Sequence, residues 1–421
     1  MERRNAWLSY KEAEETEMEK LAKAYREFLD KGKTERECVA EIVKEAEAAG
    51  YESLESKLEK GEKIKAGDKV YAVGMKKIVA LFHVGTEELS GGMSILCAHI
   101  DSPRLDVKQN PLYEDTDLAY LDTHYYGGVK KYQWVTLPLA MHGVVAKKDG
   151  SIVEISIGED AEDPVLYITD LLIHLSGKQL QKKAAEVIEG EMLDILIGSR
   201  PLAELPDDSK KDAVKQNVLK ILNEKYGIEE EDFLSAELEI VPAGKARECG
   251  LDRSMIAAYG QDDRVCAYTS LLAMLGMDTP KHTSCCLFTD KEEIGSVGAT
   301  GMQSRFFENA VAELLDAMGC YSDFGLLILA AAIIIYTMIK NILISAVIGV
   351  IGEVALIIIY VVKSSIFEGG IQKVLDVFNL SGHFDNFTSN IFDIKGIVYF
   401  LSVIAVCLFL TTQSILKRRW N

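Results

Sequence analysis

Apolar residues recur at three- and four-residue spacing through residues 1–50, with Glu and Lys between them, and this pattern predicts helix. Two shorter apolar runs, at 69–73 and 77–82, have the length of strands. The run MSILCAH at 93–99 predicts a buried strand that ends on a histidine. Because α/β sheets present their chemistry at strand ends, His99 is a candidate functional residue.

Residues 106–243 have a different sequence pattern, in which short strand-like runs and turns precede a charged helical stretch at 210–226. We interpret them as an inserted, β-rich subdomain. The pattern over 247–319 predicts a helix, a strand at HTSCCLFTD and a second helix at FFENAVAELLDAMG. The predicted fold class of this part is therefore α/β, with one domain formed by 1–105 and 244–323 around the insert.

Three long apolar runs occupy the C-terminal part of the chain. Residues 324–339 and 397–416 carry no charge, and 342–362 contains only Glu353. A membrane-spanning helix needs about 20 apolar residues, so the last two runs are long enough and the first is marginal. We therefore expect an all-α membrane segment of two to three spans over 324–421.

The charge distribution separates the same two parts. The chain has 46 basic and 65 acidic residues, a net charge of −19, which argues against a nucleic-acid partner. Up to Asp323 there are 39 basic and 60 acidic residues, against 7 and 5 beyond it. Eight cysteines without CxxC spacing predict reduced, buried thiols.

No apolar stretch near the N-terminus could serve as a signal peptide, so we expect the acidic part to be cytoplasmic.

Three short motifs in the acidic part combine histidine and carboxylates near strand ends. AHIDSPR contains His99 and Asp101, YGQDDR contains Asp262 and Asp263, and FTDKEEIGS contains Glu292 and Glu293. A lone histidine at a strand end is more often structural, and paired acidic residues are more often solvated surface. Together, however, they form the ligand types of zinc hydrolases, with one carboxylate left over to act as a base.

Longer stretches around these motifs extend the pattern over nearly all of 1–323. They include AHIDSPRLDVKQNPLYED, HYYGGVKKYQW, HLSGKQLQKKAAEVIEGEMLDILIGSRP, GLDRSMIAAYGQDDRVCAYTSLLAM and FTDKEEIGSVGATGMQSRFFENAVAELLDAMG. In this order they resemble the aspartyl aminopeptidase family of dinuclear zinc exopeptidases. The resemblance implies a homo-oligomeric enzyme that releases N-terminal residues, acidic ones included, from peptides.

The resemblance also implies a role for each matching residue. His99 would bind one of two zinc ions, Asp262 would bridge both, and Glu293 would be a terminal ligand. Glu292 would be the general base, and Asp101 would orient the His99 ring. In this family a histidine from the inserted subdomain of a neighbouring subunit reaches the active site, and the matching residue here is His174.

The sequence departs from the family after the helix that is predicted to end at Gly319. The resemblance implies a further aspartate ligand beyond this helix and a last histidine ligand near the C-terminus, and neither has a match. The only later histidine, His383, lies in a polar loop. Each zinc ion would then lack one protein ligand, so we expect impaired metal binding and activity. The missing part should also leave one edge of the sheet unpaired.

The C-terminal part, about 324–421, resembles the end of the permease subunit of exporter-type ABC transporters, most clearly from LDVFNLSGHFDNFTSN to the last residue. The basic residues 417–419 favour a cytoplasmic C-terminus, which with three spans would leave the hydrolase outside the cell, although no signal would export it. The acidic part is expected inside the cell, whereas the topology of the apolar part would place it outside. We therefore infer a junction between unrelated genes at about 320–324. The alternative functions are a membrane permease fragment and a non-catalytic chimeric product.

Overall fold

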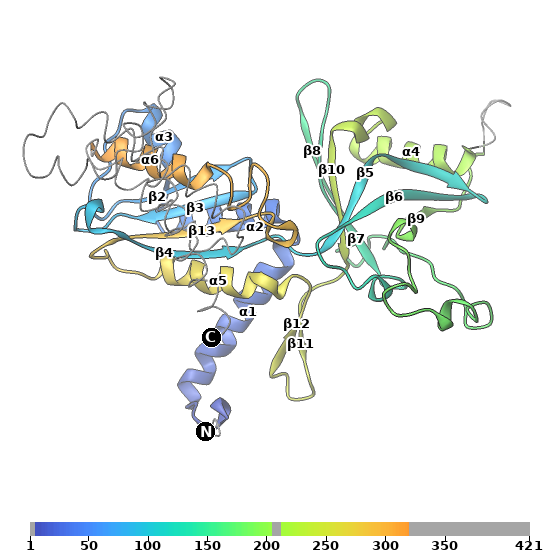
Figure 1. Ribbon diagram of the computed structural model, residues 1–421, viewed down its shortest axis with the longest axis horizontal. Coiled ribbons are helices and arrows are strands. Elements are labelled where there is room, and N and C mark those ends of the chain that lie inside the picture. The colour runs from blue at the N-terminus through green and yellow to red at the C-terminus, as the bar shows by residue number, and fades with distance from the viewer. Residues whose placement is uncertain (1–4, 204–211, 320–421) are drawn as a thin grey trace, which may run out of the picture. The chain divides into compact units, whose positions relative to one another are not determined.

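The computed structural model describes residues 5–203 and 212–319 (Figure 1). The predicted spans and the permease-like segment, 324–421, lie outside the described residues. Within the described ranges, none of the helices combines the length and apolarity that crossing a bilayer requires.

The helical pattern at the N-terminus forms two helices, α1 (Glu12–Lys31) and α2 (Glu35–Ala48), where the sequence predicted continuous helix. Gly32 ends α1, and its backbone N–H bonds the Phe28 carbonyl. Thr34 then starts α2 with a capping box, because its side chain accepts from the Glu37 N–H while the Glu37 carboxylate accepts from the Thr34 N–H. The local capping signals at 32–37 therefore override the continuous apolar periodicity.

A five-stranded sheet has the order β1-β2-β3-β13-β4. Its strands are β1 (Glu52–Ser53), β2 (Lys69–Gly74), β3 (Ile78–His83), β4 (Met93–His99) and β13 (Thr283–Thr289), which confirms the strands predicted from the apolar runs. β13 runs antiparallel to β3 and parallel to β4. Since Thr289 is the register partner of His99, the two parallel strands end side by side.

Helices pack on both faces of this sheet and give the chain its predicted α/β character (Figure 1). Side chains of α1, α2 and α5 (Gln261–Leu275) form one core with the sheet, and those of α3 (Leu54–Glu59) and α6 (Phe306–Met318) form another. The helix predicted after residue 247 begins only at Gln261, because β11 (Arg247–Cys249) and β12 (Met255–Ala257) form a hairpin first.

A second, six-stranded antiparallel sheet has the order β8-β7-β10-β5-β6-β9 and its own apolar core. Its strands are β5 (Arg104–Asp115), β6 (Leu118–Tyr126), β7 (Leu139–Ala146), β8 (Ile152–Ile157), β9 (Ile195–Gly198) and β10 (Ala236–Pro242). The charged helical stretch forms α4 (Ala213–Tyr226), which packs against it. Residues between Arg104 and Pro242 thus build a sheet separate from the one that carries His99.

The cysteines differ from the prediction in part. Cys38, Cys285 and Cys286 are buried, whereas Cys97 and Cys266 are exposed. Cys97 lies on β4, the last strand in the sheet order, and within the described ranges no strand pairs with the second edge of β4. The prediction of buried thiols is therefore wrong for Cys97 and Cys266: Cys97 lies on the edge strand β4, and Cys266 lies on α5 outside the core that this helix forms with the sheet.

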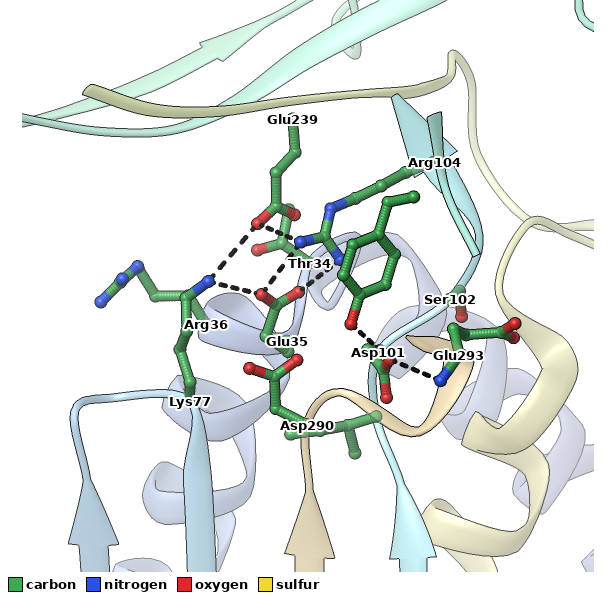
Figure 2. A network of polar contacts seen from close by, with 12 residues as sticks. Thr34, Glu35, Arg36, Lys77, Asp101, Ser102, Arg104, Glu239, Asp290 and Glu293 are labelled. Atoms are coloured by element: carbon green, nitrogen blue, oxygen red, sulfur yellow. Dashed lines mark hydrogen bonds and ion pairs between the residues drawn. The ribbon is translucent and has the colours of Figure 1, made fainter. Parts of the chain in front are cut away.

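Charged side chains join the two sheets in two groups, the first buried and the second arranged around the buried His142. The first, here called the buried ion cluster, consists of Glu35, Lys77, Arg104 and Glu239 (Figure 2). In the second, His142 of β7 contacts Glu37 of α2 at 2.8 Å and Glu159 at 3.2 Å. Burial lowers the pKa of His142, but its hydrogen bonds to Glu159 and Glu37 and their charges outweigh burial and raise the pKa to about 9.

Replacing His142 by glutamine should lower the free energy of unfolding by about 3 kcal/mol at pH 6. The folded-state pKa of about 9 lies above that of an unfolded histidine. The stabilisation is therefore present at low pH and is lost as the pH rises through about 9. Denaturant unfolding of the unsubstituted chain and of His142→Gln at pH 6 and pH 9 measures this pH-dependent stabilisation. The matched control is His124→Gln, at an exposed position on β6; a deficit for His142→Gln that is the same at both pH values would contradict the assignment.

Candidate metal centre

The three acidic and histidine-containing motifs meet at one end of the β4–β13 pair. His99 is the last residue of β4, and the turn after β13 leads into the short 3-10 helix η8 (Glu292–Ile294). Asp262 lies in the first turn of α5. The fold therefore brings together residues that are nearly 200 positions apart because two parallel strands end at the same edge.

The distances define a compact donor cluster formed by His99, Asp262, Glu292 and Glu293. His99 Nε2 is 3.3 Å from Asp262 Oδ1 and 3.8 Å from Glu292 Oε2. One potential ligand atom from each of His99, Glu292 and Glu293 lies within 4.8 Å of the others. The His99 side chain is 12% exposed and that of Asp262 is 88% exposed. The histidine is therefore buried in the protein, whereas the Asp262 carboxylate faces solvent.

Asp101 fixes the buried side of this cluster. Its carboxylate is fully buried and accepts hydrogen bonds from the Tyr126 hydroxyl at 2.7 Å and from the backbone N–H groups of Glu292 and Glu293, each at 3.2 Å. Asp101 Oδ1 also lies 3.3 Å from His99 Nδ1. Because Nδ1 faces Asp101, His99 Nε2 faces the other carboxylates.

The electrostatics of the cluster show accumulated negative charge. Burial lowers the pKa of His99, but the hydrogen bond to Asp101 and the charges of Asp101 and Glu292 raise it to about 9. Burial raises the pKa of Glu293, and the charges of Asp101, Glu292 and Asp262 raise it further against the opposing effect of His99. A divalent cation would offset this repulsion, and one imidazole nitrogen with several carboxylate oxygens is a donor set that zinc accepts.

Two residues beside the cluster were not predicted from the sequence. Tyr126, the last residue of β6, reaches Asp101 from the six-stranded sheet. Gly127 follows it with a φ of +75°, and a Cβ at this position would lie 2.9 Å from the Glu293 Cβ. Their only sequence signal is the aromatic and glycine pattern HYYGG, which indicates a tight turn but not what the turn approaches.

A cavity of about 380 Å³ adjoins the cluster at Asp262. Its lining is largely apolar and includes Pro103, Trp134, Leu137 and Tyr259. The volume lies in the range that small ligands occupy. A larger cavity of about 840 Å³ lies between α2, α3, α6 and β2, and no residue of the cluster lines it.

His174 lies apart from the donor cluster, in the connection between β8 and β9. It is exposed, and its neighbours Leu172, Ile173 and Leu175 are each about 70% exposed. A short apolar stretch that faces solvent this fully is typical of a surface that contacts another molecule. Among the described residues, the grouping of His99, Glu292 and Glu293 does not include His174.

Comparisons with known proteins give concordant matches. A family model described as aminopeptidase I zinc metalloprotease (M18) matches residues 28–345, which extends past the predicted boundary at residue 323. A probable M18 family aminopeptidase 1 from Clostridium acetobutylicum is 59% identical over 325 residues, which are 77% of this chain and 69% of the relative.

Solved structures give the same picture. The crystal structure of an M18 family aminopeptidase from Thermotoga maritima matches with a TM-score of 0.69 and 47% identity, covering 76% of this chain and 68% of that one. The dodecamer of S. cerevisiae mApe1 matches with a TM-score of 0.56 and 19% identity, covering 72% and 67%. At 19% identity, the similarity to mApe1 shows a shared fold alone.

Proposed function

The chain belongs to the M18 family of zinc aminopeptidases, and we propose that it acts on peptides with a free N-terminus and releases the first residue, acidic residues included. The matches confirm a zinc aminopeptidase of the M18 family, which is the coarser part of the resemblance inferred from the sequence motifs. The observation that carries the proposal for this chain is the convergence of His99, Asp262, Glu292 and Glu293 at the ends of β4 and β13.

The residues that would hold zinc are His99, Asp262 and Glu293, and the Asp262 carboxylate would serve two ions. The open, 88% exposed carboxylate of Asp262 suits a bridging role, because a carboxylate has two oxygens that can each bind a cation. When bound, zinc acts as a Lewis acid that polarises a carbonyl and activates water. The Asp101 carboxylate holds His99 with Nε2 directed at the cluster, as outer carboxylates do for zinc-binding histidines.

Glu292 is the proposed general base. Its side chain is 56% exposed, so Oε2 can reach solvent water while it stays 3.8 Å from His99 Nε2. The carboxylate would take a proton from water and return it to the leaving amine. The backbone N–H of Glu292 donates to Asp101 Oδ1. This hydrogen bond fixes the backbone position from which the Glu292 side chain extends.

We also propose that the protein forms a homo-oligomer and that His174 completes the active site of a neighbouring copy. The exposed apolar stretch around His174 supports this proposal, since covering it would bury several leucine and isoleucine side chains. The S. cerevisiae mApe1 structure, whose fold this chain shares, is a dodecamer.

We further propose that zinc binding and turnover are weaker here than in the longer relatives. The match covers 69% of the C. acetobutylicum protein, so about a third of that relative has no counterpart in the alignment. The resemblance implies that an aspartate and a histidine ligand belong to this part. The unpaired edge of β4, which ends at His99, is consistent with a neighbouring strand that the described residues do not supply.

The proposal is tested by assaying the full chain, loaded with zinc, on Asp- and Leu-initiated peptides and on their N-acetylated forms. We expect slow release of the first residue from free N-termini alone, loss of release with a chelator and recovery with zinc. Glu292→Gln should keep zinc but lower the rate at least about 100-fold, because it cannot accept a proton. Release that persists without metal, or that is unchanged in Glu292→Gln, would refute the proposal.

A further inference from the structure

Tyr126 is a residue of the six-stranded sheet that contacts the candidate metal centre. It is the last residue of β6 and is 5% exposed. Its hydroxyl donates to Asp101 Oδ2 at 2.7 Å, while the Glu293 N–H donates to the same oxygen at 3.2 Å. Asp101 Oδ1, in turn, faces His99 Nδ1. The hydroxyl is therefore one contact removed from a proposed zinc ligand.

The ring of Tyr126 is held by cations. The guanidinium carbon of Arg104 lies 3.9 Å from the ring centroid, and Lys291 Nζ lies 5.3 Å from it. Both distances are within the range of attractive cation–π contacts, and Arg104 is itself buried. These contacts restrict where the Tyr126 hydroxyl can point.

The buried ion cluster in turn fixes Arg104. Its guanidinium contacts Glu35 at 3.2 and 3.4 Å and Glu239 at 3.2 Å, and its Nε donates to Asp106 at 2.8 Å. Lys77 binds the same Glu35 carboxylate at 2.6 Å. Figure 2 shows Arg104 reaching between Glu35 and Glu239, with Asp101 and Glu293 beside it. A continuous set of contacts therefore runs from the buried ion cluster to Asp101.

From this geometry we infer that Tyr126 is a positioning residue for zinc. It holds Asp101 in the orientation that directs His99 at the metal and that anchors the backbone of Glu292 and Glu293. The inference rests on the proposed function. It adds that the six-stranded sheet, through one hydroxyl, sets the metal affinity of a centre built on the other sheet.

The test compares zinc affinity of the full chain with that of Tyr126→Phe, measured by competition with a chromophoric chelator. We expect the variant to bind zinc about 10- to 100-fold more weakly, the usual effect of removing an outer hydrogen-bond partner. Cobalt(II) loaded in place of zinc should show an altered visible spectrum. Tyr113→Phe is the matched control, since the Tyr113 hydroxyl donates to Asp194 at 2.6 Å on the same sheet, and it should change neither readout.

The outcomes separate this inference from the proposed function. A full chain that binds no zinc overturns both. Zinc binding with equal affinity in Tyr126→Phe, or an equal loss in Tyr113→Phe, overturns only the role of Tyr126. The thermal midpoint of the metal-free proteins shows whether each variant is folded, and the zinc titration is made below the lower midpoint.

Discussion

Replacing Glu35 by glutamine lowers the free energy of unfolding by about 3–5 kcal/mol at pH 7, the usual cost of removing one partner from a buried ion pair. The Glu35 side chain is fully buried, and its two oxygens contact Lys77 and Arg104. Burial raises the pKa of Glu35, but the charges of Arg104 and Lys77 outweigh burial and hold it well below the usual range. Glutamine would leave both buried cations without the one carboxylate that they share at 3.2 Å or less.

Glu239 supplies a control within the same cluster. Burial, followed by the charge of Glu35, raises the pKa of Glu239 to about 8, and within the described residues its buried Oε2 has no hydrogen-bond partner. Because its pKa is raised while that of Glu35 is lowered, Glu239→Gln should lower the free energy of unfolding less than Glu35→Gln does. Denaturant unfolding of both variants at pH 7 measures the contrast. Equal losses would show that the two carboxylates do not differ as described.

The sheet that carries the site was predictable because its signals are local. The runs at 93–99 and 283–289 are apolar, have strand length and end in polar residues, so the meeting of His99 with Glu292 and Glu293 follows once the two strands pair in parallel. The break between α1 and α2 was not predicted, although the Thr34 and Glu37 capping pair is a local signal that indicated it.

The support of the site could not be predicted in the same way. In sequence, Glu35 lies among polar residues, and Lys77 and Arg104 look like ordinary charges, Lys77 beside an apolar run. Their burial arises only when α2, the start of β3 and the start of β5 meet. The contact of Tyr126 with Asp101 likewise joins two sheets, and periodicity along one strand carries no information on contacts between sheets.

Replacing His99 by alanine should have the largest effect on the metal. Of the donor cluster formed by the described residues, His99 is the one imidazole, and its Nε2 faces both Asp262 and Glu292. The substitution removes this proposed ligand and also leaves Asp101 without its histidine partner. We therefore expect zinc affinity to fall by more than the roughly 10- to 100-fold typical of an outer-shell partner. His124→Ala, at an exposed position on β6, is the matched control and should bind zinc as the unsubstituted chain does.

The most direct test of the proposed metal centre is the zinc content of the full chain after equilibrium dialysis against buffered zinc, measured together with His99→Ala and His124→Ala. The site described above predicts bound zinc in the unsubstituted chain and in His124→Ala, and none above background in His99→Ala. Equal zinc in all three proteins, or none in the unsubstituted chain, would contradict a metal centre at the ends of β4 and β13.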